Sequence, residues 1–396
     1  MSTVTEGAAL DAAELRRRVA EFVAAHDPAT TGQKEFLAAR FDAGLAWVHF
    51  PEGAGGLGAP RALQSVVDDE FARLGAAPEG REGLVIGLGM AAPTILAFGT
   101  PEQRERFLKP LYTGEEVWCQ LFSEPGAGSD LAALGTRAVR DGDGWTVNGQ
   151  KVWTSLAHQA RWAILVARTD PDVPKHAGMT YFVCDMRAEG VEVRPLRQIT
   201  GEAEFNEVYL TDVHLPDDLR LGEVGQGWKV AQTTLMNERV AIGGQPDPRE
   251  GGLIGVVSDI WRERPELRTP GTHDALMRLW VEAEAARMTK ERLRQQPGPE
   301  GSAAKYAFSR LNQEISGLEL ELLGQEGLLY DDWTFRRPEG VAFTKRGAGF
   351  HYLRSKGNSI EGGTTEILRT IIAERILGLP GEPRVDKDVA WKDLPT

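Results

Sequence analysis

The chain has 396 residues, 41% of them hydrophobic, and carries a formal net charge of −13 at pH 7. Its length predicts two or three domains, and its acidic balance argues against a nucleic-acid-binding protein, because phosphate binding needs a basic face. With Cys119 and Cys184 as its two cysteines, no apolar signal region and no run of about 18 apolar residues, we expect a cytoplasmic protein without disulfides, a thiolate metal site or a membrane span.

Residues 1–116 are expected to form an N-terminal all-helical domain. Asp11 and Glu14 have the spacing of a capping box, and apolar residues recur at helical spacing from Leu15 onward. Residues 51–58, Pro-Glu-Gly-Ala-Gly-Gly-Leu-Gly, formally contain the pattern G-x-G-x-x-G. Because no hydrophobic strand leads into this stretch, we interpret it as a plain turn and not as a dinucleotide-binding loop.

The pattern changes to short alternating segments in residues 117–222, which predicts a compact middle β domain, either a barrel or a sandwich. Residues 223–380 have apolar positions at three- and four-residue spacing, which is typical of long helices packed in a bundle. Residues 381–396 mix proline, glycine and charge, so we expect an extended tail. These expectations together predict an α+β fold class.

Residues 118–130, Trp-Cys-Gln-Leu-Phe-Ser-Glu-Pro-Gly-Ala-Gly-Ser-Asp, have the pattern of a strand that breaks into a glycine-rich turn. Gly126 and Gly128 let the backbone approach a ligand closely, and the Ser129 hydroxyl with the free N–H groups of the turn can bind a phosphate. Taken alone, the pattern fits either a nucleotide cofactor site or an ordinary turn.

A second pattern follows in residues 134–155, which are expected to form two strands joined by a turn at 141–144. Strand spacing predicts that Trp153 and Ser155, two residues apart, lie on one face. An aromatic ring and a hydroxyl would then lie together beside the glycine-rich turn.

The two runs, Ser-Glu-Pro-Gly-Ala-Gly-Ser-Asp and Asn-Gly-Gln-Lys-Val-Trp-Thr-Ser, resemble the flavin-binding part of the acyl-CoA dehydrogenase family. A third block, residues 359–375, is similar to the C-terminal helix of that family. The resemblance in order and spacing extends from about Pro51 to Pro380, which is nearly the whole chain.

This resemblance implies an FAD-dependent acyl-CoA dehydrogenase with an N-terminal helical domain, a middle β domain and a C-terminal four-helix bundle. Such an enzyme of fatty acid or lipid metabolism removes the α-proton of an acyl-CoA thioester with a carboxylate, while the β-hydride moves to flavin N5. It forms a trans-2-enoyl-CoA and passes electrons to an electron-transfer flavoprotein or similar acceptor. The residues that the resemblance places at the flavin are Gln120, Phe122, Ser123, Ser129, Trp153, Ser155, Thr364 and Glu366.

Two carboxylates are candidates for the catalytic base. Glu361 resembles the Glu-Gly-Thr base of medium- and short-chain members, but counting back from Ile367 puts Gly362 at the base position. Glu238, followed by Arg239, resembles the Glu-Arg pair that provides the base from a helix in isovaleryl and long-chain type members, which carry glycine where the others carry glutamate. We therefore predict Glu238 as the base and Glu361 as the alternative, with the Gly362 N–H bonding the thioester oxygen. Arg239 is predicted near the CoA moiety.

Two stretches depart from the family pattern: residues 262–271 stand where an Arg-x-x-Phe-Gly motif is common, and residues 321–327 where a Gln- and Gly-Gly-rich motif is common. Family members usually form dimers or tetramers, so we expect a homodimer or homotetramer. A heteromer with a second dehydrogenase-like chain, as in bacterial enzymes for steroid-type CoA thioesters, is an alternative, as are a flavin-dependent oxidase or monooxygenase of the same fold and a non-enzymatic scaffold subunit. His158 has no second His or Cys at ligand spacing, so no metal site is expected.

Overall fold

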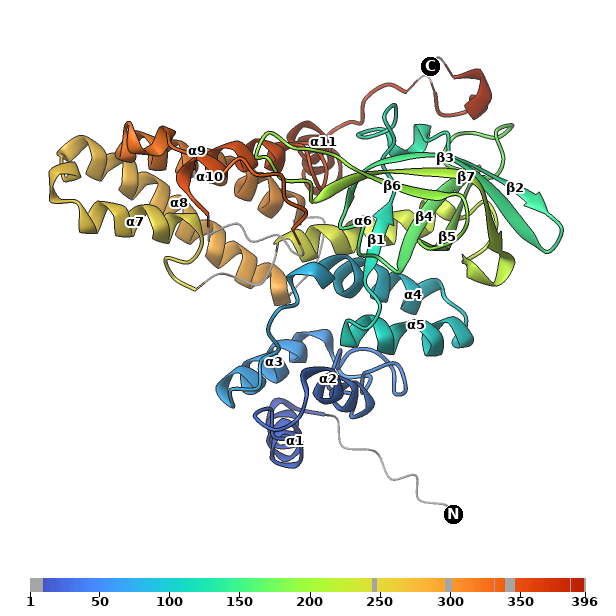
Figure 1. Cartoon of the computed structure of the whole chain (residues 1–396), viewed down its shortest axis with the longest axis horizontal. Coiled ribbons are helices and arrows are strands. Elements are labelled where there is room, and N and C mark those ends of the chain that lie inside the picture. The colour runs from blue at the N-terminus through green and yellow to red at the C-terminus, as the bar shows by residue number, and fades with distance from the viewer. Residues whose placement is uncertain are drawn as a thin grey trace.

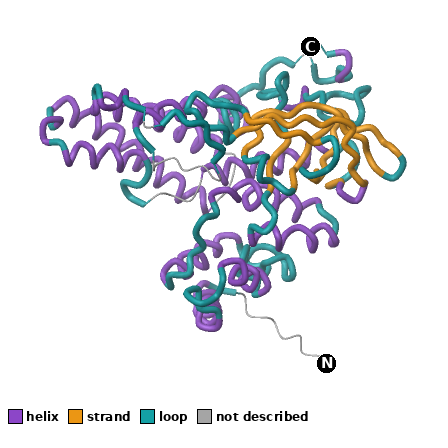
Figure 2. The backbone as a smooth tube through the Cα atoms, viewed as in Figure 1, coloured by secondary structure: helices purple, strands orange, loops and turns teal. Residues whose placement is uncertain are grey.

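The computed structural model describes residues 10–243, 248–295, 301–330, 332–338, 346–384 and 386–394, with the backbone alone for 82, 239–243 and 294–295. Helices come first along the chain, then one sheet, then helices again (Figure 1). Figure 2 shows the strands gathered in one body with helices beside and below it. The predicted α+β class is confirmed. The domain boundaries proposed at 116/117 and 222/223 fall between secondary-structure elements.

The N-terminal helices begin where the sequence supplies caps. The Asp11 carboxylate accepts a hydrogen bond from the Glu14 backbone N–H at 2.9 Å, as the predicted capping requires. Thr100 and Gln103 form a full capping box at the start of a later helix. Residues 51–58 form turns with no strand before them, which confirms the turn interpretation. The helices are α1 (Ala12–Ala25), α2 (Gln33–Asp42), α3 (Gln64–Arg73), α4 (Ala92–Phe98) and α5 (Pro101–Thr113).

The middle part is one strongly curved sheet of eight strands. They are β1 (Trp118–Leu121), β2 (Arg137–Asp141), β3 (Gly144–Ser155), β4 (Trp162–Arg168), β5 (Met179–Asp185), β6 (Val191–Pro195), β7 (Phe205–Pro216) and β8 (Arg220–Leu221). The path runs β6-β7-β3-β2-β4-β5-β8, and β1 pairs with β4 in parallel. Inward-facing side chains such as Cys119, Val147 and Phe182 form a core of their own inside the curve. The predicted tight turn between β2 and β3 is present, with Asp141 paired to Gly144.

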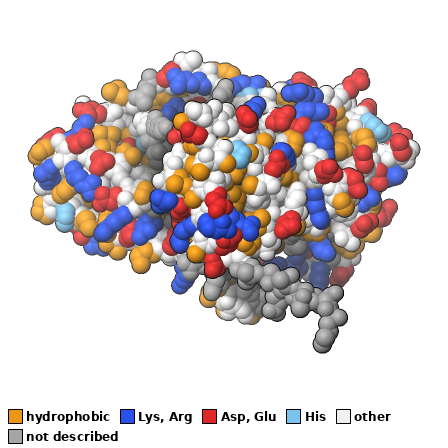
Figure 3. All heavy atoms as spheres, turned by 90° about the horizontal axis from the view of Figure 1, so that it is seen from below, with side chains coloured by type: hydrophobic (Ala, Val, Ile, Leu, Met, Phe, Trp, Pro, Cys, Tyr) orange, Lys and Arg blue, Asp and Glu red, His pale blue; other side chains and the backbone are white. Residues whose placement is uncertain are grey.

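The C-terminal part consists of α6 (Gly227–Gly243), α7 (Leu253–Glu263), α8 (Pro270–Gln295), α9 (Gly301–Leu323), α10 (Ala348–Ser355) and α11 (Thr365–Ile371). Leucine and isoleucine side chains of α7, α8 and α9 share a core, as their spacing predicts. Acidic and basic side chains are interspersed over the face that Figure 3 shows.

The tail corrects one expectation, because it is not extended throughout. Residues 386–394 turn back onto the sheet, where Ala390 pairs with Pro174 and the Trp391 indole N–H donates to the Ala133 carbonyl at 3.1 Å. A 3₁₀ turn follows at Trp391–Asp393. The Trp391 ring packs over the Arg168 guanidinium, which gives this polar segment an apolar anchor.

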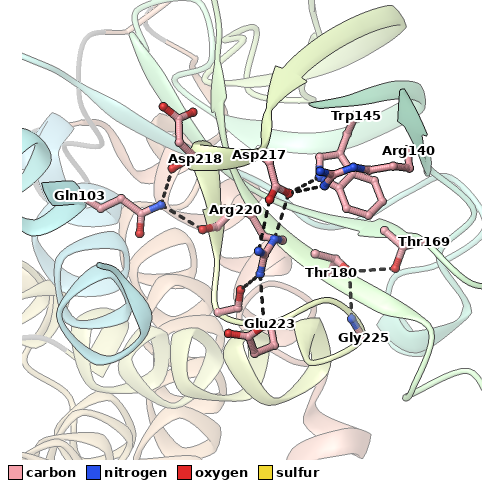
Figure 4. A network of polar contacts seen from close by, with 11 residues as sticks. Gln103, Arg140, Trp145, Thr169, Thr180, Asp217, Asp218, Arg220, Glu223 and Gly225 are labelled. Atoms are coloured by element: carbon pink, nitrogen blue, oxygen red, sulfur yellow. Dashed lines mark hydrogen bonds and ion pairs between the residues drawn. The ribbon is translucent and has the colours of Figure 1, made fainter. Parts of the chain in front are cut away.

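A polar network joins α5 to the sheet and to the start of α6 (Figure 4). The Gln103 amide donates to the backbone carbonyls of Asp218 at 2.6 Å and Arg220 at 2.9 Å. The Asp217 carboxylate accepts from Arg220 at 3.1 Å and from the Trp145 indole at 2.7 Å. The Arg220 hydrogen bond is the main cause that lowers the pKa of Asp217 to about 2. These contacts tie α5 of the N-terminal part to the sheet.

Candidate active site

A cavity of about 2290 Å³ lies between the sheet, α6 and the C-terminal helices. Sites for one drug-sized ligand occupy about 300–1,000 Å³, so this cavity has room for two large ligands. The predicted site residues that line it are Gln120, Phe122, Ser123, Ser129, Trp153, Ser155, Glu238, Glu361, Gly362 and Thr364. Glu366 is exposed and does not belong to the lining. The Arg239 side chain lies outside the described residues.

The glycine-rich turn after β1 is held from beneath by Lys151 of β3, whose side chain is 0% exposed. Its ammonium donates to the Phe122 carbonyl at 2.9 Å, the Val166 carbonyl at 3.0 Å and the Glu124 carboxylate at 2.8 Å. Glu124 also accepts from the backbone N–H groups of Gly135 at 2.7 Å and residue 136 at 2.9 Å. All three N–H donors of the buried Lys151 ammonium therefore bind groups in the wall of the cavity.

Burial and pairing act against each other in this ion pair. Burial lowers the pKa of the Lys151 ammonium, although Glu124 opposes the shift. Burial would raise the pKa of Glu124, but the charge and hydrogen bonds of Lys151 hold it below its usual range. Pairing thus offsets part of the penalty that burial places on the charged form of each group.

Trp153 does not follow the strand alternation that the sequence predicts. The pairing of β3 with β7 shifts between Lys151 and Thr154, and Trp153 in this bulge has φ of 61°, the left-handed region that side chains rarely adopt. Its ring is 58% exposed and touches only the edge of Phe205 among its aromatic neighbours in the described chain. Strained residues cluster at ligand sites, and this one presents an open aromatic face to the cavity next to Ser155.

Glu238 lies on α6 and faces β1 across the cavity. The Gln120 side-chain amide donates to the Glu238 carboxylate at 3.4 Å, a long hydrogen bond. One turn earlier, the buried Thr234 hydroxyl contacts the Tyr181 hydroxyl at 2.9 Å and the Thr94 hydroxyl at 2.8 Å. These contacts fix α6 against β5 and α4, and so fix the height at which Glu238 reaches the cavity.

Glu361 is held by a network of its own. It accepts two hydrogen bonds from Arg354, at 2.9 and 3.2 Å, and one from the Asn358 amide at 2.5 Å. Arg354 also forms an ion pair with buried Glu204 at 3.1 Å. Burial raises the pKa of Glu204, although Arg354 opposes the shift. One guanidinium therefore serves two carboxylates, and Glu361 belongs to a structural network at the base of the loop.

Gly362 and Gly363 follow Glu361 with φ of 62° and 94°, a backbone shape that favours glycine. Thr364 then caps α11, its hydroxyl accepting from the Ile367 N–H at 3.2 Å. The loop thus turns its backbone, without side chains, toward the cavity at Gly362.

The sequence interpretation missed two buried lysines that support the cavity wall, Lys151 and Lys305. Side chains of β3 point alternately to the two faces of the sheet, and Lys151 stands at an inward-facing position. A charged residue at such a position indicates that it pairs with a buried partner. Lys305 lies on the buried side of α9 in the same way. Within the described part of the chain, no group of His, Cys, Asp or Glu could hold a metal ion, and no helix is long and apolar enough to cross a membrane.

Three family models match the chain in order: acyl-CoA dehydrogenase N-terminal domain at residues 11–115, middle domain at 119–213 and C-terminal domain at 225–377. Among curated proteins, the chain is 42% identical to acyl-CoA dehydrogenase FadE34 of Mycobacterium tuberculosis over 379 residues, which covers 93% of this chain and 49% of FadE34. It is 38% identical to acyl-CoA dehydrogenase IpdE1 of the same organism, over 86% of each chain. The chain thus spans about half the length of FadE34.

Two solved structures are similar along almost their whole length. A chain of the ChsE4-ChsE5 complex from Mycobacterium tuberculosis is 29% identical, with a TM-score of 0.70 and coverage of 96% of this chain and 100% of that one. A chain of the Tcur3481-Tcur3483 steroid ACAD is 26% identical, with a TM-score of 0.70 and coverage of 94% and 98%.

Proposed function

The chain belongs to the acyl-CoA dehydrogenase family, whose members are FAD-dependent flavoproteins, and on this premise we propose that it dehydrogenates an acyl-CoA thioester to a trans-2-enoyl-CoA with Glu238 as the base. The observation that carries the assignment of the base is the position of Glu238, which faces the cavity from α6 opposite β1. Glu361 also lines the cavity, but its carboxylate accepts from Arg354 and Asn358 in the network at the base of the loop.

The residues present fit FAD. The cavity has room for a dinucleotide beside a second ligand, the open ring of Trp153 can lie against a flat heterocycle, and the hydroxyls of Ser123, Ser129 and Ser155 are available along its wall. Bound there, FAD would supply the acceptor for the hydride that leaves the β-carbon of the substrate.

The chain's own residues would do the rest. The Glu238 carboxylate would take the α-proton, and negative charge would then develop on the thioester oxygen. The Gly362 N–H would donate to that oxygen, where a preorganised donor stabilises the transition state more than the ground state. Walls built from the sheet and the helix bundle would exclude water from the reacting carbons.

Two variants test the base. Glu238→Gln is expected to retain FAD and substrate binding but to reduce its flavin with acyl-CoA at least 100-fold more slowly, because a general base contributes about 10²–10⁴-fold. Glu361→Gln, the matched control, should lower stability and keep the rate of flavin reduction within about tenfold. Anaerobic stopped-flow absorbance measures this rate. A large loss of rate in Glu361→Gln with little loss in Glu238→Gln would reverse the assignment.

The partners are proposed on the same premise. Electrons would pass to an electron-transfer flavoprotein or a similar acceptor. A homodimer or homotetramer remains the first expectation, but two observations favour a heteromer as the second: both similar solved structures are named for a pair of chains, and FadE34 is about twice as long as the stretch that matches this chain. A second chain that copurifies, or FAD occupancy near one per two chains, would support the heteromer.

The size of the acyl group can be tested by flavin reduction as well. The cavity volume and the name of the Tcur3481-Tcur3483 steroid ACAD both support a bulky acyl group. A panel of straight, branched and ring-bearing acyl-CoA thioesters, added to the anaerobic protein, should bleach the flavin fastest with the ring-bearing thioester. Equal or faster bleaching by short straight chains would contradict a bulky substrate.

A further inference from the structure

Lys305 of α9 is a buried lysine to which the proposed reaction assigns no role so far. It is 1% exposed, and its ammonium donates to the backbone carbonyls of Asn358 at 2.6 Å and Gly363 at 2.9 Å. Ser309, one turn later on the same helix, donates to the same Asn358 carbonyl at 2.6 Å. Together α9 and these two donors hold both ends of the loop that carries Gly362.

A neutral donor can hold a loop carbonyl, as Ser309 does for the Asn358 carbonyl. Burying an ammonium costs several kcal/mol unless its charge is compensated, so a buried lysine on two neutral carbonyls needs a reason. The nearby Glu361 carboxylate is bound to Arg354 and Asn358. Burial lowers the pKa of Lys305, while the charges of Glu361 and Glu238 oppose the shift, so the ammonium lies within electrostatic range of the proposed base.

This arrangement matters because proton abstraction relocates a negative charge. The α-proton moves to Glu238, which becomes neutral, and the electron pair of the broken C–H bond moves toward the thioester oxygen at the Gly362 N–H. A fixed positive charge favours that relocation where it lies closer to the thioester oxygen than to Glu238, and the hydrogen bond to the Gly363 carbonyl places the ammonium directly behind the residue that follows Gly362. Ser309 lacks such a charge, although it fixes the same carbonyl.

We propose that Lys305 is a positioning residue of the dehydrogenation: it orients the Gly362 N–H toward the thioester oxygen, and its buried charge favours the negative charge that develops there. The inference rests on the proposed function, since it presupposes that an acyl-CoA thioester reacts in this cavity. It concerns the step that follows substrate binding, so it predicts an effect on rate and not on affinity.

Lys305→Gln removes the charge and keeps two N–H donors, although its amide nitrogen lies one atom closer to the backbone than the ammonium, so the loop must shift slightly to keep both hydrogen bonds. We expect this variant to keep its FAD and to bind the enoyl-CoA product within about threefold of the wild type, but to reduce its flavin at saturating acyl-CoA about 30- to 300-fold more slowly. Lys305→Met, which removes donors as well, should be slower still. Arg310→Gln is the matched control, because it removes a positive charge from the same helix at a position that pairs with Glu282 and Glu314 and does not line the cavity, and it should stay within about threefold of the wild-type rate.

The outcomes are distinguishable. A Lys305→Gln rate within threefold of the wild type would show that the charge is not used and overturn the proposal. A loss of FAD or of folded structure, followed by absorbance and circular dichroism, in both lysine variants would assign Lys305 a purely structural role and overturn it as well. If the wild-type flavin is not reduced by any thioester, the proposed function itself fails, which the wild-type measurement reveals before any variant is compared.

Discussion

Replacing Lys151 with methionine should destabilise the wall of the cavity that β3 and the glycine-rich turn form. Methionine keeps the length and apolar stem of lysine but removes the ammonium from two carbonyls and from Glu124. Removing one member of a buried pair typically costs about 3–5 kcal/mol. In the variant, Glu124 keeps two backbone N–H donors and is 12% exposed. We therefore expect a loss of stability at the lower end of this range, about 3 kcal/mol.

The change should be measured as local opening, because a chain of three parts need not unfold in one step. A cost of about 3 kcal/mol corresponds to an opening equilibrium raised about 100-fold or more. Hydrogen–deuterium exchange of peptides covering β3 and β4, read by mass spectrometry, should therefore accelerate by that factor, while peptides of α1 and α3 keep their rates. Acceleration below tenfold in β3 and β4 would refute the magnitude derived from the buried pair.

A double variant tests the cause. If the uncompensated Glu124 carboxylate is what destabilises Lys151→Met, then adding Glu124→Gln should cost little further or restore part of the loss, with a coupling of about 1–3 kcal/mol. Strict additivity of the two single changes would instead attribute the loss to the carbonyls that lose their donor.

Two further predictions concern the frame around the site. Asp217→Asn should lower the thermal unfolding temperature at pH 7, and by less at pH 3. Because Arg220 depresses the Asp217 pKa from 3.8 to about 2, the stabilisation by the ionised carboxylate is present above pH 4 and is lost as the pH falls toward 2. A difference in unfolding temperature that does not depend on pH would contradict this reasoning. Gly227→Ala should lower the unfolding temperature by the equivalent of about 1–3 kcal/mol, because the added Cβ would lie 2.7 Å from the backbone of Met179. Gly317→Ala in α9, where nothing lies within 4 Å of the added Cβ, is the control and should be neutral or slightly stabilising.

Much of the fold was predictable because its signals are local. The cap at Asp11, the tight turn between β2 and β3 and the helical spacing of the bundle core depend on neighbours within a few residues, and all are present in the structure. The path of the tail was not predictable, because its return to the sheet depends on Trp391 meeting Ala133 and Arg168, which are more than 200 residues away in the chain.

Most of the residues that the motifs identified line one cavity, but their arrangement in it was not predictable. Sequence spacing could not show that Glu361 pairs with Arg354, that Trp153 leaves the strand alternation in a bulge, or that Lys305 reaches two carbonyls of a distant loop. Each of these depends on contacts between elements, which periodicity along one element does not report.

The parallel pairing of β1 with β4 has a consequence for how the chain folds. Trp118 pairs with Trp162, and between them the chain must first complete the glycine-rich turn and the β2-β3 hairpin. Hairpins form in microseconds because their strands are neighbours in the chain. The pairing of β1 with β4 instead closes a long loop, and the chain entropy lost in closing it is compensated only once the contacts between the two strands form. The strand that carries Gln120 is therefore expected to join the sheet late, so that a chain still emerging from synthesis acquires this wall of the cavity only after β4 has been made.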